Sequence, residues 1–93
     1  MMTGMFAVSL AGHDKGKMYV IIREDNEYVY LADGDKKPVE NPKKKKKKHV
    51  QPVKTGLDKI LVNKLQNAKV IYNEEIKYAI KVKAKQEVAN VKS

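Results

Sequence analysis

The 93-residue sequence contains no cysteine, a single arginine and no long apolar stretch. Without cysteine there is neither a disulfide framework nor a thiolate metal site, so a hydrophobic core must hold the fold, as fits an intracellular protein. No segment approaches the roughly 20 apolar residues that a membrane-spanning helix needs. The short apolar run near Phe6 follows no basic residues, which argues against a secretory signal. We therefore expect a cytoplasmic protein that does not enter a membrane.

The sequence also lacks the residue patterns of an enzyme. A chain of this length forms one small domain, which buries about 60 to 65% of its unfolded surface and leaves little room for a catalytic cavity. His13 and His49 are the only histidines, and two imidazoles without cysteine make a poor metal site. Residues 12–18 fail as a phosphate-binding loop, since three residues separate the glycines where four are needed and Met18 replaces Ser or Thr. We predict no catalytic residues, metal, cofactor or small-molecule substrate.

Positive charge is abundant and concentrated in one window. Of the net +9, residues 36–54 carry nine lysines against one carboxylate, which gives +8. At the centre lie six consecutive lysines, residues 43–48, followed by His49. Such clustering is typical of nucleic-acid binders, because each phosphate neutralised by a lysine releases condensed counterions. The alternative is a solvated loop without a dedicated partner.

Nineteen of the twenty basic residues are lysines, with Arg23 as the exception. Lysine is a mobile point charge, whereas arginine presents a planar fork that reads base edges. We therefore expect contacts to the phosphate backbone of RNA and little direct base readout.

Residues 6–53 carry the pattern of an all-β domain. Short β-forming segments, separated by turn residues, are found at residues 6–10, 17–24, 28–32 and 49–53. Residues 25–27 form a tight hairpin turn between two of them. Four or five short strands in about fifty residues predict a small barrel. If Val50 points inward, Lys48 and Lys46 share its side. We therefore expect either that pairing begins only near Lys48 or that these lysines lie at the barrel rim with their stems along it, so that most of the run projects as a mobile basic finger.

Alternation along the second and third strands predicts which side chains fill the barrel. One set is aliphatic and is expected inside: Met18, Val20, Ile22, Val29 and Leu31. The other set is expected outside: Tyr19, Ile21, Tyr28 and Tyr30. The outer tyrosines either pack under a helix, which we favour, or form a surface on which RNA bases stack.

After Pro52 the apolar period becomes helical. Leu57, Ile60, Leu61 and Leu65 share a helix face, and a second helix is expected to start with Asn73 as its N-cap. A strand through residues 78–84 is the rival interpretation, since apolar residues there also alternate with lysines.

Three segments resemble one known family: residues 5–22 (MFAVSLAGHDKGKMYVII), residues 29–34 (VYLADG) and residues 41–50 (NPKKKKKKHV). Together they are similar to the bacterial KOW-domain RNA-binding proteins, which are related to the archaeal and eukaryotic large-subunit ribosomal protein fourteen-e. The resemblance implies an SH3-like five-stranded barrel that binds structured RNA, ribosomal RNA above all. Gly16 corresponds to the central KOW glycine, with Lys15 and Lys17 beside it on an RNA-facing loop.

Two features depart from the family pattern. Met18 and Tyr19 replace the second glycine of the fuller KOW motif, and the residues from Lys54 onward match nothing in the family.

We thus predict an SH3-like KOW barrel over residues 1–53 and a helical extension over residues 54–93, packed on or beside the barrel. The predicted function is non-catalytic RNA binding by a monomer, in the ribosome or its assembly. The alternative is an SH3-like protein-interaction module of the transcription or translation machinery, which uses the tyrosines or residues 57–65. The predicted RNA-binding residues are Lys15, Lys17, Lys36, Lys37, Lys43, Lys44, Lys45, Lys46, Lys47, Lys48 and His49.

Overall fold

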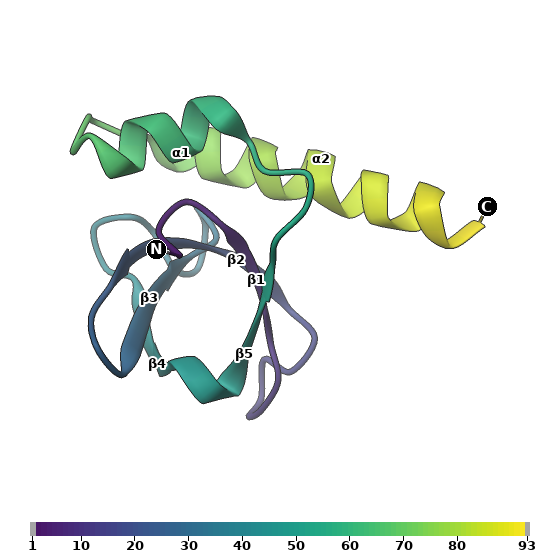
Figure 1. The fold of residues 1–93 in the computed structure, drawn as a ribbon, viewed down its shortest axis with the longest axis horizontal. Coiled ribbons are helices and arrows are strands. Elements are labelled where there is room, and N and C mark those ends of the chain that lie inside the picture. Colours follow the sequence, from purple (N-terminus) through teal and green to yellow (C-terminus); the bar gives the residue numbers. More distant parts are fainter. Residues whose placement is uncertain (1, 93) are drawn as a thin grey trace.

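A computed structural model describes residues 2–92 of the chain, and the side chains of residues 2–86. Five antiparallel strands precede two α-helices (Figure 1). The strands are β1 (Phe6–Ser9), β2 (Met18–Glu24), β3 (Tyr28–Ala32), β4 (Lys43–Lys46) and β5 (Val50–Val53). The helices are the 3₁₀ helix η1 (Lys47–His49), α1 (Lys59–Gln66) and α2 (Asn73–Lys92). The predicted β domain followed by two helices is confirmed.

The strands lie side by side in the order β4-β3-β2-β1-β5. The sheet curls, and η1 joins its two edge strands on the side away from α1 and α2 (Figure 1). Within the described residues β4 and β5 form no ladder with each other, so backbone hydrogen bonds do not close the sheet into a barrel. The five strands of the predicted barrel are present, and its closure is not.

Both faces of the sheet carry apolar side chains. The inner side of the curl is filled by Ala7, Tyr19, Ile21, Val29, Leu31 and Val50. The outer side packs against the two helices through Phe6, Val20, Ala32, Leu61, Ile76 and Ala79. Leu61, Ile76 and Ala79 of the two helices thus share a core with the strands, in which burial of a large aliphatic side chain contributes about 1.5 to 3 kcal/mol.

The prediction of which β2 side chains face inward was wrong. Tyr19 and Ile21 lie inside with Val29, whereas Val20 lies under the helices with the partly buried Met18. Alternation separates two sets of side chains but does not say which set is inside when both are apolar. Here both faces of β2 are covered, one by the curl of the sheet and one by the helices.

A carboxylate accepts a backbone N–H at the start of both α-helices. Before α1, the Asp58 carboxylate accepts the N–H of Leu61 (3.1 Å). At α2, the Glu75 carboxylate accepts the N–H of Tyr72 (2.8 Å), so Asn73 is not the cap that the sequence predicted. Asn73 instead accepts the N–H of Val39 (2.8 Å), which ties α2 to the connection between β3 and β4. The helix through residues 78–84 is confirmed, and the rival strand is excluded.

Candidate nucleic-acid interface

The lysine run begins as a strand, not as the mobile finger that the sequence predicted. Four of its lysines form β4 and pair with β3, with Lys43 opposite Leu31 and Lys46 opposite Tyr28. Lysine has a low preference for strands, but a paired edge position accepts it. Because side chains alternate along a strand, pairing divides the run into an inner set and an outer set.

The inner set consists of Lys43 and Lys45, and Lys45 is the more deeply buried of the two. Its side chain is 10% exposed, and its ammonium group donates to Asp14 Oδ1 (2.9 Å), Ser9 Oγ (2.6 Å) and the Ala11 carbonyl (2.7 Å). An ammonium group has three donors, and all three are used here. Lys45 therefore links β4 to the end of β1 and the loop that follows it.

Asp14 is the centre of this network. Its Oδ2 accepts from Lys43 (2.7 Å) and from the Tyr19 hydroxyl (2.8 Å), while Ser9 Oγ lies 2.8 Å from Oδ1. Burial alone raises the pKa of Asp14, but the hydrogen bonds from Lys43, Lys45, Ser9 and Tyr19 hold it far below its usual range. Burial, followed by the bond to Asp14, raises the pKa of Tyr19. The carboxylate is ionised and is bound on both oxygens.

Sequence reasoning missed Asp14, which it treated only as part of a turn. The available signal was that the turn holds one carboxylate, flanked by Lys15 and preceding a strand that begins Met18-Tyr19. A buried tyrosine hydroxyl needs a partner, and so does any lysine that points into a small curled sheet. Those two requirements together identify Asp14 as the acceptor once the inner positions are known.

Two more of the predicted RNA-binding lysines form ion pairs. Lys47 pairs with Glu24 (3.2 Å) and Lys17 pairs with Asp33 (2.6 Å). Burial raises the pKa of Asp33, but its hydrogen bond with Lys17 and those from two backbone N–H groups outweigh this and lower it. After Lys46 the chain turns through η1, and this changes the side on which Val50 lies. Val50 therefore packs inside although the lysines that share its parity, Lys46 and Lys48, point outward.

The outer set consists of Lys44, Lys46 and Lys48. All three are exposed, and among residues 2–86 none of them forms an ion pair. Glu27 lines the same hollow as Lys46, Lys47 and Lys48. The prediction treated six lysines alike, and the structure separates them into three paired and three exposed cations.

Two tyrosines and the single arginine share the outer face with Lys44 and Lys46. Tyr28 lies opposite Lys46, and Tyr30 lies between Lys44 on β4 and Arg23 on β2. The Arg23 guanidinium lies 4.1 Å from the centroid of the Tyr30 ring, and Lys44 Nζ lies 4.3 Å from that of Tyr28. We call Arg23, Tyr28, Tyr30, Lys44 and Lys46 the tyrosine face.

Tyr28 and Tyr30 lie outside the core beneath the helices. The described residues that pack beneath α1 and α2 include neither Tyr28 nor Tyr30, and both rings are half-buried. The preferred prediction, in which the tyrosines pack under a helix, is therefore wrong for these two. It is also wrong for Tyr19, which lies in the inner core.

Asp25 closes one end of the tyrosine face. Its carboxylate accepts the N–H groups of Tyr28 (2.8 Å) and Glu27 (3.1 Å), and the Tyr30 hydroxyl lies 3.3 Å away. The bond from the Tyr28 N–H is the main reason that the pKa of Asp25 is lowered. This is the hairpin turn predicted at residues 25–27, and it also holds Tyr30 in place.

The remaining predicted residues lie elsewhere. Lys15 is exposed in the turn between β1 and β2, and Lys36 and Lys37 lie in the connection between β3 and β4. Asp33 links two of the predicted residues, because it pairs with Lys17 and accepts the N–H of Lys37 (2.8 Å). The register of β2 and β3 places this end of the sheet opposite the end that carries Arg23 and Tyr28. His49 is half-buried in η1.

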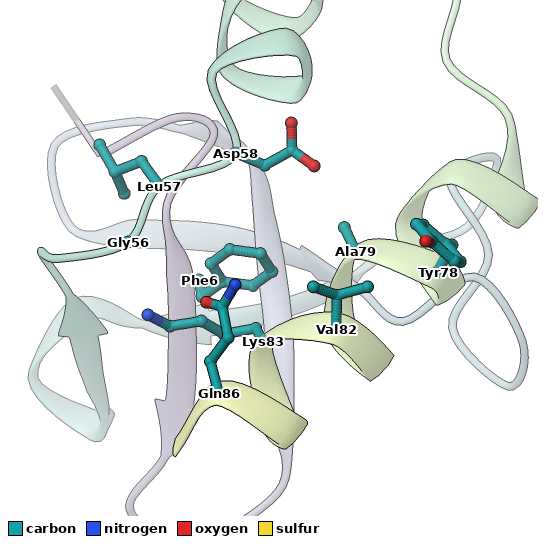
Figure 2. Close-up of a pocket in the computed structure, with 9 residues that line it drawn as sticks. All are labelled: Phe6, Gly56, Leu57, Asp58, Tyr78, Ala79, Val82, Lys83 and Gln86. Atoms are coloured by element: carbon teal, nitrogen blue, oxygen red, sulfur yellow. The ribbon is translucent and has the colours of Figure 1, made fainter. Parts of the chain in front are cut away.

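A small cavity of about 140 Å³ lies between the segment after β5 and α2 (Figure 2). It is lined by Phe6, Gly56, Leu57, Asp58, Tyr78, Ala79, Val82, Lys83 and Gln86. Lys83 donates to the Thr55 carbonyl (2.9 Å) and Asp58 caps α1, so both charged groups hold the backbone. The Lys83 bond ties α2 to the segment after β5, and the residues that line the cavity include no pair of groups arranged for acid–base chemistry.

No group of three metal-ligating side chains lies close enough within the described part of the chain to hold a metal ion. None of the described helices combines the length and the apolar character that crossing a membrane requires. Neither a known protein-family model nor a curated protein sequence matches this chain.

Proposed function

We propose that this protein binds RNA and does so without catalysing a reaction. The observation that carries the proposal is the outer side of the lysine run, where Lys44, Lys46 and Lys48 are exposed and unpaired within the described residues. Arg23 adds a fourth cation beside them. The ligand is a polyanion whose phosphates these cations neutralise.

The contrast with the inner lysines supports this proposal. The fold needs Lys45 and Lys43, since they neutralise Asp14 where it is shielded from water. Lys44 and Lys46 form no ion pair among the described residues, although the charge of Lys44 helps to lower the pKa of Asp25. Like charges on one face of a strand repel. An external row of phosphates removes that repulsion and releases counterions at the same time.

The likeness of residues 5–22, 29–34 and 41–50 to the KOW-domain proteins supports RNA as the polyanion, and ribosomal RNA in particular. Five antiparallel strands in the order β4-β3-β2-β1-β5 are compatible with the SH3-like barrel of that family. The proposed setting is therefore the bacterial ribosome or its assembly in the cytoplasm, with the protein acting as a monomeric part of a ribonucleoprotein.

The test replaces Lys44, Lys46 and Lys48 by Glu and compares the result with Lys59, Lys77 and Lys81 replaced by Glu. Both triple variants change the charge equally, and all six lysines are exposed. Affinity for a fluorescein-labelled ribosomal RNA fragment is measured by anisotropy at several salt concentrations. The native protein should lose roughly 0.7 to 0.9 log units of affinity per log unit of salt for each phosphate contact.

We call the variant with Lys44, Lys46 and Lys48 replaced the β4 variant and the other the helix variant. We expect the β4 variant to lose at least about 100-fold in affinity, since it replaces three phosphate contacts by three repulsions. The helix variant should change by no more than about 3-fold, and circular dichroism should be the same for all three proteins. Equal losses in both variants would show that net charge, and not this face, is what RNA responds to. Full affinity in the β4 variant would remove the proposal.

A protein-interaction module is the second candidate function, and exposed apolar side chains on the helical part favour it. Ile60 is 71% exposed, Val70 70% and Tyr72 64%. Lys59, Lys64 and Lys69 border the hollow that Ile60 lines, so an acidic partner with apolar side chains fits this surface. Sedimentation of a cell lysate through sucrose, with and without ribonuclease, separates the candidates. Comigration with ribosomes that ribonuclease abolishes supports RNA, and a complex that survives ribonuclease supports the protein partner.

A further inference from the structure

The tyrosine face offers more than charge to a nucleic acid. Tyr28 and Tyr30 are alternate residues of β3, so their side chains leave the same side of the sheet. Each ring carries a cation, Arg23 over Tyr30 and Lys44 over Tyr28. Aromatic rings and guanidinium planes are the groups on which proteins stack exposed bases.

The spacing of the rings restricts which bases can reach them. Alternate residues of a strand lie about 6.6 Å apart. Successive bases within a duplex are stacked face to face and are enclosed by their neighbours. Two bases can occupy Tyr28 and Tyr30 together only if they are pulled apart and unpaired. A double helix presents phosphates to this face but no base surfaces.

We propose that the tyrosine face binds an unpaired segment of RNA, with one base on Tyr28 and a neighbouring base on the Arg23–Tyr30 pair. This inference rests on the proposed RNA-binding function and names the part of the RNA that the site takes. Lys44 and Lys46 lie opposite the two tyrosines on β4, where they meet the phosphates that flank the stacked bases. Bulges, loops and single-stranded ends are thus preferred to continuous helices.

The contacts around the rings suit this role. Lys44 is exposed, so its ammonium group can leave the Tyr28 ring for a phosphate without loss of any ion pair within the described residues. Arg23 is also exposed, and its guanidinium lies 4.1 Å from the centroid of the Tyr30 ring, so a base can stack on the guanidinium in place of the ring. The Asp25 carboxylate is occupied by two backbone N–H groups and lies near the Tyr30 hydroxyl, so it orients the ring and ends the face.

The experiment compares two fluorescein-labelled RNAs, an oligouridine and a continuous duplex, each about 12 nucleotides long, within the site size of single-strand-binding domains. The variant carries Tyr28→Ala and Tyr30→Ala. Its matched control carries Tyr72→Ala and Tyr78→Ala, which are exposed tyrosines on the helical part, 64% and 69% exposed. Both variants lose two phenol rings and keep the net charge.

We expect Tyr28→Ala with Tyr30→Ala to weaken oligouridine binding by about 100-fold, or about 10-fold for each ring. The affinity for the duplex should stay within about 2-fold of native, because the phosphate contacts remain. The slope of affinity against salt should be unchanged with both RNAs. The control variant should behave as the native protein. Tyr28→Phe with Tyr30→Phe should restore oligouridine binding, because the ring and not the hydroxyl does the stacking.

Arg23→Lys gives a second measurement that does not depend on the folding of the double alanine variant. It keeps the charge and removes the guanidinium plane, so oligouridine binding should fall about 5-fold at an unchanged salt slope. Equal losses for duplex and oligouridine, or no loss for either variant, would overturn the inference while RNA binding stands. Failure of the native protein to bind either RNA at low salt would overturn both proposals.

Discussion

Lys44 and Lys45 are neighbours in a run of identical residues, yet Lys44 lies in solvent over an aromatic ring and Lys45 is 10% exposed. The difference comes from the pleat of β4 and not from the residue type. On the inner side the ammonium groups complete the fold, and on the outer side they remain available to a ligand. A basic run inside a sheet therefore cannot be counted as one binding site.

The inner side also shows how an open sheet is held together. β4 and β5 are not paired, and the ion pairs of Lys43 and Lys45 with Asp14 bridge β4 to the loop after β1 instead. A buried ion pair adds little stability compared with apolar packing, but removal of one partner leaves the other charged and unsatisfied. The inner lysines are expected to be sensitive to substitution and the outer lysines tolerant.

Asp14→Asn tests the inner side most strongly. The substitution keeps the shape of the side chain but leaves Lys43 and Lys45 without a counter-charge, and such a loss costs about 3 kcal/mol, the low end for a buried pair. For a domain of this size the melting temperature should fall by roughly 12 to 24 °C. Thermal unfolding followed by circular dichroism measures the change.

Asp35→Asn is the matched control for this substitution. Asp35 is exposed, and its carboxylate takes no part in any ion pair among residues 2–86. Its melting temperature should stay within about 2 °C of native, as for most surface substitutions. If Asp14→Asn and Asp35→Asn have the same melting temperature, the Asp14 network does not hold β4 in place.

Acid should weaken the inner side, because an ionised carboxylate holds its lysines. The pKa of Asp14 is lowered by folding, so its contribution is fully present above the unfolded value of about 3.9 and is lost as pH falls toward the folded value. Native protein should lose stability steadily below about pH 4. Asp14→Asn should show a shallower decline over the same range, as measured by urea unfolding at several pH values. Parallel curves for the two proteins would contradict a shifted Asp14.

Single alanine variants of Lys44 and Lys45 sharpen the comparison in the binding assay. Lys44→Ala should lower the salt slope of RNA affinity by about 0.7 to 0.9 and leave the melting temperature unchanged. Lys45→Ala should lower the melting temperature and keep the salt slope of the folded protein, because its ammonium group is already held by Asp14, Ser9 and Ala11. A loss of slope in both variants would mean that the inner pair opens when RNA binds.

Local signals in the sequence were enough for the helices and for most strands. The hairpin at residues 25–27 follows from its turn residues, and the Asp25 carboxylate that closes the turn is seen at the expected place. The start of α2 near residue 73 follows from its apolar spacing and its acidic first turn. These features depend on neighbours in the chain, which a sequence displays directly.

Features that depend on distant residues were not predictable in this way. Alternation in β2 could not choose between its two apolar faces, because the choice is set by where the helices dock. The lysines of β4 have no strand preference of their own and pair because β3 offers an edge. Asp14 acquires its role only when β4 lies across from its loop, at a separation of 29 residues from Lys43.

Lys47→Ala and Lys48→Ala give the smallest expected effect and ask whether the inner and outer sides persist beyond the strand itself. Lys47 pairs with Glu24 at 3.2 Å, and the side chains are 31% and 19% exposed, so solvent screens the pair. Burial raises the pKa of Glu24, but the N–H of Met2 and the ammonium group of Lys47 lower it overall.

We expect Lys47→Ala to cost about 0.5 kcal/mol, which lowers the melting temperature by about 2 to 4 °C. Lys48→Ala should leave the melting temperature unchanged and weaken RNA binding instead. The reverse result would place the boundary between the two sets at the end of β4 and would confine the alternation to Lys43–Lys46.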